Sequence, residues 1–223
     1  MTGRRLLAHA LLAMTAAACA SDVDATPPSR EEVVQWCTDA SDTAQCNRLI
    51  EAQQLKRLPG LAVRSGNALK ISLFPTGAVT LTDTDDLQGG TSYSLWDNLS
   101  PIDAVVVALT REDRTTYVLL MRDNGRKFDL PAEPVLAPDG RHLVTADFCV
   151  RECSNQVALW QVARDGVSES AAWKPAPSWS DAAITWQDAD TLAIVYTTMG
   201  ETQDRVQQRK LGDPVFGSRA ARR

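Results

Sequence analysis

The sequence contains very little histidine, with His9 and His142 the two among 223 residues. His9 lies in the N-terminal export segment described below, so a Ser-His-Asp site would have to use His142. The G-x-S-x-G motif of many serine hydrolases is absent, and one histidine does not complete a usual zinc site. These absences argue against both chemistries, and we predict that His142 is an exposed residue at the start of a strand.

The sequence also lacks an excess of positive charge and any hydrophobic run of membrane length. Its formal net charge is −5 at pH 7, which gives no electrostatic footprint for nucleic acid. No stretch approaches the roughly 18 consecutive apolar residues of a membrane helix. With 44% hydrophobic and 23% charged residues, the composition is that of a globular protein.

Residues 1–18 have the pattern of a bacterial signal peptide. Arg4 and Arg5 precede a short apolar run at 6–14, and small residues follow. Residues 19–29 are small, polar and proline-containing, which is typical of a flexible tether. The protein is therefore expected to be exported across a bacterial inner membrane.

Two processing sites compete at the end of this signal. The triplet Ala-Cys-Ala fits cleavage before Ser21, whereas Ala-Ala-Ala-Cys resembles a lipobox in which Cys19 would carry a lipid. Cysteine counting favours the lipobox, because exported proteins pair their thiols and five cysteines leave one over. The other four form two local pairs, predicted to be structural disulfides: Cys37 with Cys46, and Cys149 with Cys153.

Residues 30–60 carry the signals of two short helices. Ser29 followed by acidic residues predicts a first N-cap. Asp42, with a glutamine three residues later, predicts a second helix start, and Pro59 ends that helix. The first cysteine pair spans the break between these helices, so its disulfide would staple a helical hairpin.

Residues 61–211 form a predicted β domain, followed by a tail at 212–223. Apolar and polar residues alternate in ten to twelve short segments separated by turn residues, which favours a sandwich, barrel or propeller. The expected strands lie at 68–74, 78–82, 102–110, 116–123, 126–130, on both sides of the turn in 134–147, at 156–162, 167–174, 181–186, 191–197 and around 205–211.

The stretch LAPDGRHLVTAD…NQVALWQVARDG resembles a blade unit of the WD40 and TolB-like propeller families. The segment WSDAAITWQDADTLAIVYT is similar to the start of a following blade, so the resemblance covers roughly residues 130–200. At about 40–45 residues per blade, the β domain supplies three or four blades. We therefore expect a mostly β fold: a small or incomplete propeller-like array of antiparallel sheets, or a twisted sandwich, with the stapled helices at its N-terminus.

Acidic and aromatic residues supply the candidate sites. Asp83, Asp85 and Asp86 alternate in a loop as a calcium site requires, although the glycine and glutamate of an EF-hand loop are absent. The alternative is a solvated acidic turn. The aromatic candidates flank or occupy predicted loops, where they would anchor a protein partner or else cover the ends of the sheets; they are Tyr93, Trp96, Trp173 and Trp179. Two further tryptophans, Trp160 and Trp186, lie on predicted strands and are expected in the core.

The helix, hairpin and blade-like order also resembles uncharacterised bacterial envelope lipoproteins, a resemblance that implies no activity. The expected function is a non-catalytic, periplasm-facing binding protein, anchored to the outer membrane by lipid or else soluble in the periplasm. Its partner would be an envelope protein that it assists or inhibits, as an immunity protein does. The alternatives are a carboxylate-dependent envelope hydrolase and a purely structural envelope component. Calcium is the one cofactor considered.

Overall fold

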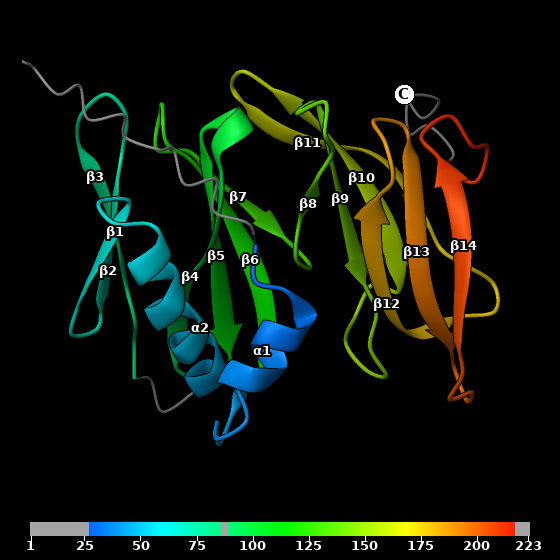
Figure 1. The fold of residues 1–223 in the computed structure, drawn as a ribbon, viewed down its shortest axis with the longest axis horizontal. Coiled ribbons are helices and arrows are strands. Elements are labelled where there is room, and N and C mark those ends of the chain that lie inside the picture. Colours follow the sequence, from blue (N-terminus) through cyan, green and yellow to red (C-terminus); the bar gives the residue numbers. More distant parts are fainter. Residues whose placement is uncertain (1–26, 86–88, 217–223) are drawn as a thin grey trace, which may run out of the picture.

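The computed structural model describes residues 27–85 and 89–216. The fold is mostly β, with four antiparallel sheets and two helices (Figure 1). Within these ranges, the helices are too short and too polar to cross a membrane. Cys19 and Asp86 lie outside the described residues, as do the predicted signal peptide and most of the predicted tether.

The two helices form where their capping residues predict. α1 (Arg30–Trp36) begins with a reciprocal capping box, in which the Ser29 hydroxyl accepts from the Glu32 amide at 3.2 Å. α2 (Thr43–Arg57) is capped by Asp42, whose carboxylate accepts from the Gln45 amide at 2.8 Å. The predicted Cys37–Cys46 disulfide joins the end of α1 to the first turn of α2 and is confirmed. It fixes the helical hairpin.

Each sheet is a meander of consecutive strands. The first sheet contains β1 (Ala62–Ser65), β2 (Ala68–Ser72) and β3 (Ala78–Thr82). The second contains β4 (Thr91–Leu99), β5 (Ala104–Arg111), β6 (Arg114–Met121) and β7 (Lys127–Leu130), with a 3-10 turn at Ser100–Ile102 after β4. The third contains β8 (Val135–Leu136), β9 (His142–Asp147), β10 (Gln156–Ala163) and β11 (Gly166–Trp173). The fourth contains β12 (Trp179–Trp186), β13 (Thr191–Thr198) and β14 (Asp204–Lys210).

The four sheets follow one another across the molecule in chain order, and α2 lies along the second sheet (Figure 1). Three apolar cores fill the spaces between successive sheets. The sequence of β5 is almost wholly apolar because its side chains enter two cores: Val105 and Val107 lie in the first core, and Val106 lies in the second. Both faces of the second sheet are therefore buried, which is why this strand lacks alternation.

The turn at residues 138–140 joins β8 to β9, as its sequence predicts. Gly140 has φ +67° and donates its amide to the Ala137 carbonyl at 2.9 Å. His142 begins β9, also as predicted, but its ring is only partly exposed and lies 3.2 Å from Asp139 Oδ2. β4 is the main strand that the sequence did not predict, because its apolar residues are mixed with serine, aspartate and asparagine.

Candidate functional site

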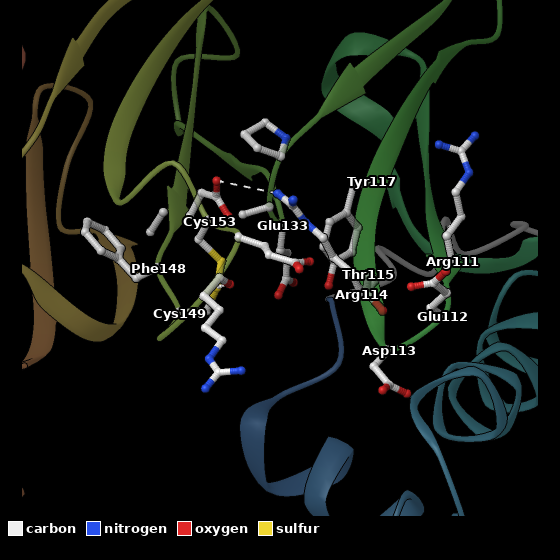
Figure 2. Close-up of a pocket in the computed structure, with 16 residues that line it drawn as sticks. Arg111, Glu112, Asp113, Arg114, Thr115, Tyr117, Glu133, Phe148, Cys149 and Cys153 are labelled. Carbon is white, nitrogen blue, oxygen red and sulfur yellow. Dashed lines mark hydrogen bonds and ion pairs between the residues drawn. A yellow bond between two sulfur atoms is a disulfide. The ribbon is translucent and has the colours of Figure 1, made fainter. Parts of the chain in front are cut away.

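A cavity of about 610 Å³ lies between the second and third sheets (Figure 2). Its lining comes from the β5–β6 turn, from β6, from the link between β7 and β8, and from the end of β9 with the loop that follows. Figure 2 shows Glu133 inside this space, between Tyr117 on one side and the disulfide of Cys149 and Cys153 on the other. The cavity therefore combines a carboxyl group, an aromatic ring and a stapled loop.

Glu133 is held in place by one hydrogen bond. It lies in the short link Leu130–Pro131–Ala132–Glu133–Pro134, and the indole Nε1 of Trp96 donates to its Oε1 at 2.8 Å. Burial raises the pKa of Glu133, and the hydrogen bond from Trp96 offsets part of this rise. No hydrogen-bond partner for the second carboxyl oxygen occurs among residues 27–85 and 89–216.

A β-bulge in β4 brings Trp96 to Glu133. Leu95 pairs with Val107 and Asp97 pairs with Val106, so Trp96 is the extra residue on this strand. A regular strand would send neighbouring side chains to opposite faces. Because of the bulge, Trp96 and Asp97 both face the second core. Trp96 belongs to that core, and so does Val106, the residue with which Asp97 pairs.

Asp97 is a second acid with an altered titration. Burial raises the pKa of Asp97 to about 6; the hydrogen bond from the Asn98 amide, at 2.7 Å, lowers it, and the charge of Glu133 raises it further. Tyr117 completes the group: its ring meets that of Trp96 edge to face at 5.4 Å. Burial, and then the Glu133 charge, raises the pKa of Tyr117 well above the usual value.

The loop at residues 148–155, here called the stapled loop, forms the opposite wall. The predicted Cys149–Cys153 disulfide closes it and is confirmed. Asp147 Oδ2 accepts from the Ser154 amide at 2.7 Å and from its hydroxyl at 2.6 Å, which fixes the end of the loop. Val150, at its tip, is 72% exposed. A disulfide that closes so short a ring removes little chain entropy from the unfolded state, so its main effect is to hold the shape of the loop.

The backbone of this loop is strained as well as stapled. Glu152 has φ +68° and Asn155 has φ +51°. Residues other than glycine adopt this left-handed region at a cost, and such residues cluster at functional sites. Glu112, in the β5–β6 turn on the same cavity, has φ +53°. Two such residues, Glu112 and Glu152, therefore line this cavity from opposite walls.

Two of the aromatic anchors predicted from the sequence are buried, so that prediction is wrong for them. Trp96 is 6% exposed and belongs to the second core. Trp179 is 3% exposed and stacks on Tyr196 at 4.2 Å in the third core. Trp96 lies within β4 and Trp179 begins β12, and each ring is on the face of its sheet that packs against a core. Trp173 is partly buried against the same core, with the Arg209 guanidinium 5.2 Å from its ring.

The remaining predicted residues do not join the cavity. Tyr93 packs, partly buried, against the first core. Trp160 and Trp186, expected in the core, are partly buried against the second and third cores. Asp85 borders a different, smaller cavity of about 490 Å³ near the N-terminus of α2.

Asp83 belongs to a partly buried cluster of ion pairs with two arginines. Its Oδ2 contacts the guanidinium groups of Arg48 and Arg64, the second at 3.4 Å, and its Oδ1 accepts from the Tyr93 amide at 2.9 Å. Glu51, 3% exposed, pairs with Arg64 at 2.7 Å and ties α2 to the first sheet. In the described part of the chain, no three His, Cys, Asp or Glu side chains lie close enough to hold a metal.

Sequence reasoning missed Glu133 and Asp97, which have the strongest claim to chemistry here. One signal was available: Glu133 lies between two prolines, Pro131 and Pro134, in a link that is otherwise apolar. Asp97 carried no such signal, because the bulge that buries it depends on pairing with β5.

Comparisons with protein-family models, with curated proteins and with solved structures gave no match. The function of the cavity must therefore be argued from its own residues.

Proposed function

We propose that this protein is a non-catalytic binding protein that faces the periplasm, where it engages a protein partner at the cavity and the stapled loop. Two disulfides support an extracytoplasmic location, because such bonds persist in oxidising compartments. The lipid anchor at Cys19 and an accessory or inhibitory role remain part of this proposal. The row of four meandering sheets supports an open, propeller-like scaffold.

The observation that carries the proposal is the construction of the stapled loop. An exposed loop that stays ordered loses little conformational entropy on binding, so its contacts contribute more to affinity. This loop is closed by a disulfide and anchored by Asp147, and its ring carries an exposed valine followed by two charged residues, Arg151 and Glu152. It borders a cavity large enough to accept a side chain.

The test compares two valines of equal exposure. Val150 is 72% exposed at the loop tip, and Val206 is 70% exposed on β14 of the fourth sheet. We expect Val150→Asp to reduce crosslinked capture of a stoichiometric protein partner from the native envelope at least tenfold, and Val206→Asp to leave it unchanged. Equal capture by both variants, or loss only with Val206→Asp, would contradict the proposed surface.

A carboxylate-dependent hydrolase is the second candidate, favoured by the raised pKa of Glu133 inside a cavity. Asp147 does not supply its second acid, because Ser154 and Arg114 already occupy that carboxylate. Hydrolysis would release soluble fragments from purified cell-wall material with the wild type and not with Glu133→Gln. Absence of release with both proteins would exclude this candidate for that substrate.

A further inference from the structure

No cation contacts the Glu133 carboxyl group among the described residues. The charged and titratable groups that line the same cavity are Arg114 and Tyr117 on β6, Asp147 on β9, Arg111, Glu112 and Asp113 at the β5–β6 turn, and Arg151 and Glu152 in the stapled loop; Asp97 on β4, Arg30 on α1 and Asp181 on β12 border adjoining hollows. No hydrogen bond or ion pair joins any of these arginines to Glu133, and two of them face another acid. Arg114 lies 3.9 Å from Asp147, and Arg30 lies 3.8 Å from Asp181.

Glu133 is therefore left with an indole donor alone. An ionised carboxylate removed from water is unfavourable unless a cation or several donors compensate it. Here one oxygen accepts from Trp96, and the charge of Glu133 raises the pKa of the nearby Asp97. The lining of the cavity carries more carboxyl groups than guanidinium groups, so its local charge is negative.

The cavity walls suit a cation in a second way. Tyr117 and Phe148 both line the space, and an aromatic face attracts ammonium and guanidinium groups. The ring of Trp96 meets Tyr117 edge to face, which fixes its orientation. A basic side chain would meet Glu133 at its tip and apolar or aromatic surface along its stem.

We propose that the cavity binds the ammonium or guanidinium group of a basic side chain from the partner protein, with Glu133 as its counterion. This inference deepens the proposed function and rests on it for the source of the cation. The basic group would donate to the free oxygen of Glu133, while the other oxygen keeps its bond from Trp96. The stapled loop would then contact the chain that flanks the basic residue.

Proton linkage gives the interaction a defined sign. Burial raises the pKa of Glu133, so the free carboxyl holds its proton to a higher pH than an exposed glutamate does. A bound cation favours the ionised form, so binding to the neutral form must release that proton. The affinity is therefore expected to increase as the pH rises through the range in which the free carboxyl titrates, while the lysine side chain, with a pKa near 10.4 in peptides, stays charged.

The test is an NMR titration with a blocked pentapeptide, Gly-Gly-Lys-Gly-Gly, and its norleucine counterpart. The readout is the Trp96 indole Nε1–H, because this proton is bonded to Glu133. We expect a saturable shift with the lysine peptide and none with the norleucine peptide. Glu133→Gln should weaken binding about tenfold or more, since hydrogen bonds to charged groups are the strong ones. Glu112→Gln, an exposed acid on the same rim, should leave it unchanged.

The remaining indole signals report whether Glu133→Gln keeps the fold, and glutamine can still accept from Trp96. No shift with excess lysine peptide, or equal shifts for wild type and Glu133→Gln, would overturn the cation site. If capture of the partner still depended on Val150, the proposed function would stand without it. A lysine-specific shift without Val150-dependent capture would instead reject the protein partner and keep the site.

Discussion

Asp97→Asn offers the sharpest test of the electrostatics at this site. Asp97 is 3% exposed and accepts a hydrogen bond from the Asn98 amide at 2.7 Å, which an asparagine oxygen can also accept. The substitution keeps the shape of the side chain and removes its charge. It therefore isolates the cost of an ionised carboxylate beside Glu133 within the second core.

The magnitude follows from the pKa of Asp97, which rises from 3.8 to about 6 on folding. The folded state then binds this proton more tightly than the unfolded state does. Its contribution to stability is complete below pH 3.8 and is lost as the pH rises through 6. At about 1.36 kcal/mol per pH unit, the loss amounts to about 3 kcal/mol. Relative to the wild type, Asp97→Asn should gain that amount between pH 4 and pH 7.

Urea unfolding followed by tryptophan fluorescence measures this difference at each pH. The offset at pH 4 reports the cost of placing the new amide group, and the change above pH 4 reports the charge alone. Asp181→Asn, at an exposed surface pair, controls for loss of one negative charge and should change stability by about 0.5 kcal/mol or less. A difference between Asp97→Asn and wild type that stays constant from pH 4 to pH 7 would refute the reasoning.

Three further outcomes are expected. Gly166→Ala should destabilise the protein by about 2–4 kcal/mol, because the new Cβ would lie 1.9 Å from the Phe128 ring. Gly200→Ala, where the Cβ would meet open space, should cost only about 1 kcal/mol of backbone strain. Equal losses of stability for the two variants in urea melts would show that the Phe128 ring moves aside. Replacing Cys37 and Cys46 with serine should cost about 2.5 kcal/mol, the chain entropy of a short ring, and an unchanged unfolding midpoint would contradict a stapling role. Serine at both cysteines of the stapled loop should cost about 2 kcal/mol and should weaken partner capture more than the first pair does; the reverse order, measured by urea melts and capture on the same variants, would remove the loop from the interface.

Local signals in the sequence predicted much of this fold. Ser29 and Asp42 begin helices because their side chains accept backbone amides, an interaction that spans three residues. The turn at Gly140 depends on its own left-handed backbone. The disulfide pairs were predictable because each joins cysteines nine or four residues apart. In each case the cause lies within about ten residues of its effect.

The features that the sequence did not predict depend on partners distant in the chain. β4 is a strand because β5 pairs with it, although Ser94 and Asp97 would suit a loop. The buried face of α2 carries Glu51 and Gln54 beside Ile50, and distant groups satisfy both polar side chains: Arg64 pairs with Glu51, and the carbonyl of Trp96 accepts from Gln54 at 2.6 Å. A search for an apolar helix face could not have found this.

The candidate site divides in the same way. The sequence identified the second disulfide, and with it the loop at the cavity. It did not predict that Trp96 and Trp179 are buried: a tryptophan beside a proline-containing loop can turn its ring back into the core, as Trp179 does. Local sequence did not identify Glu133, because its place in the site depends on the hydrogen bond from Trp96 of β4.

The central claim is that the stapled loop beside the cavity touches a partner protein. A photo-crosslinking amino acid at position 150, compared with the same residue at position 206, tests this most directly in the native envelope. We predict one dominant crosslinked protein from position 150, identified by mass spectrometry, with a basic residue near the crosslinked site, and none shared with position 206. The same products from both positions, or none from position 150, would contradict the account.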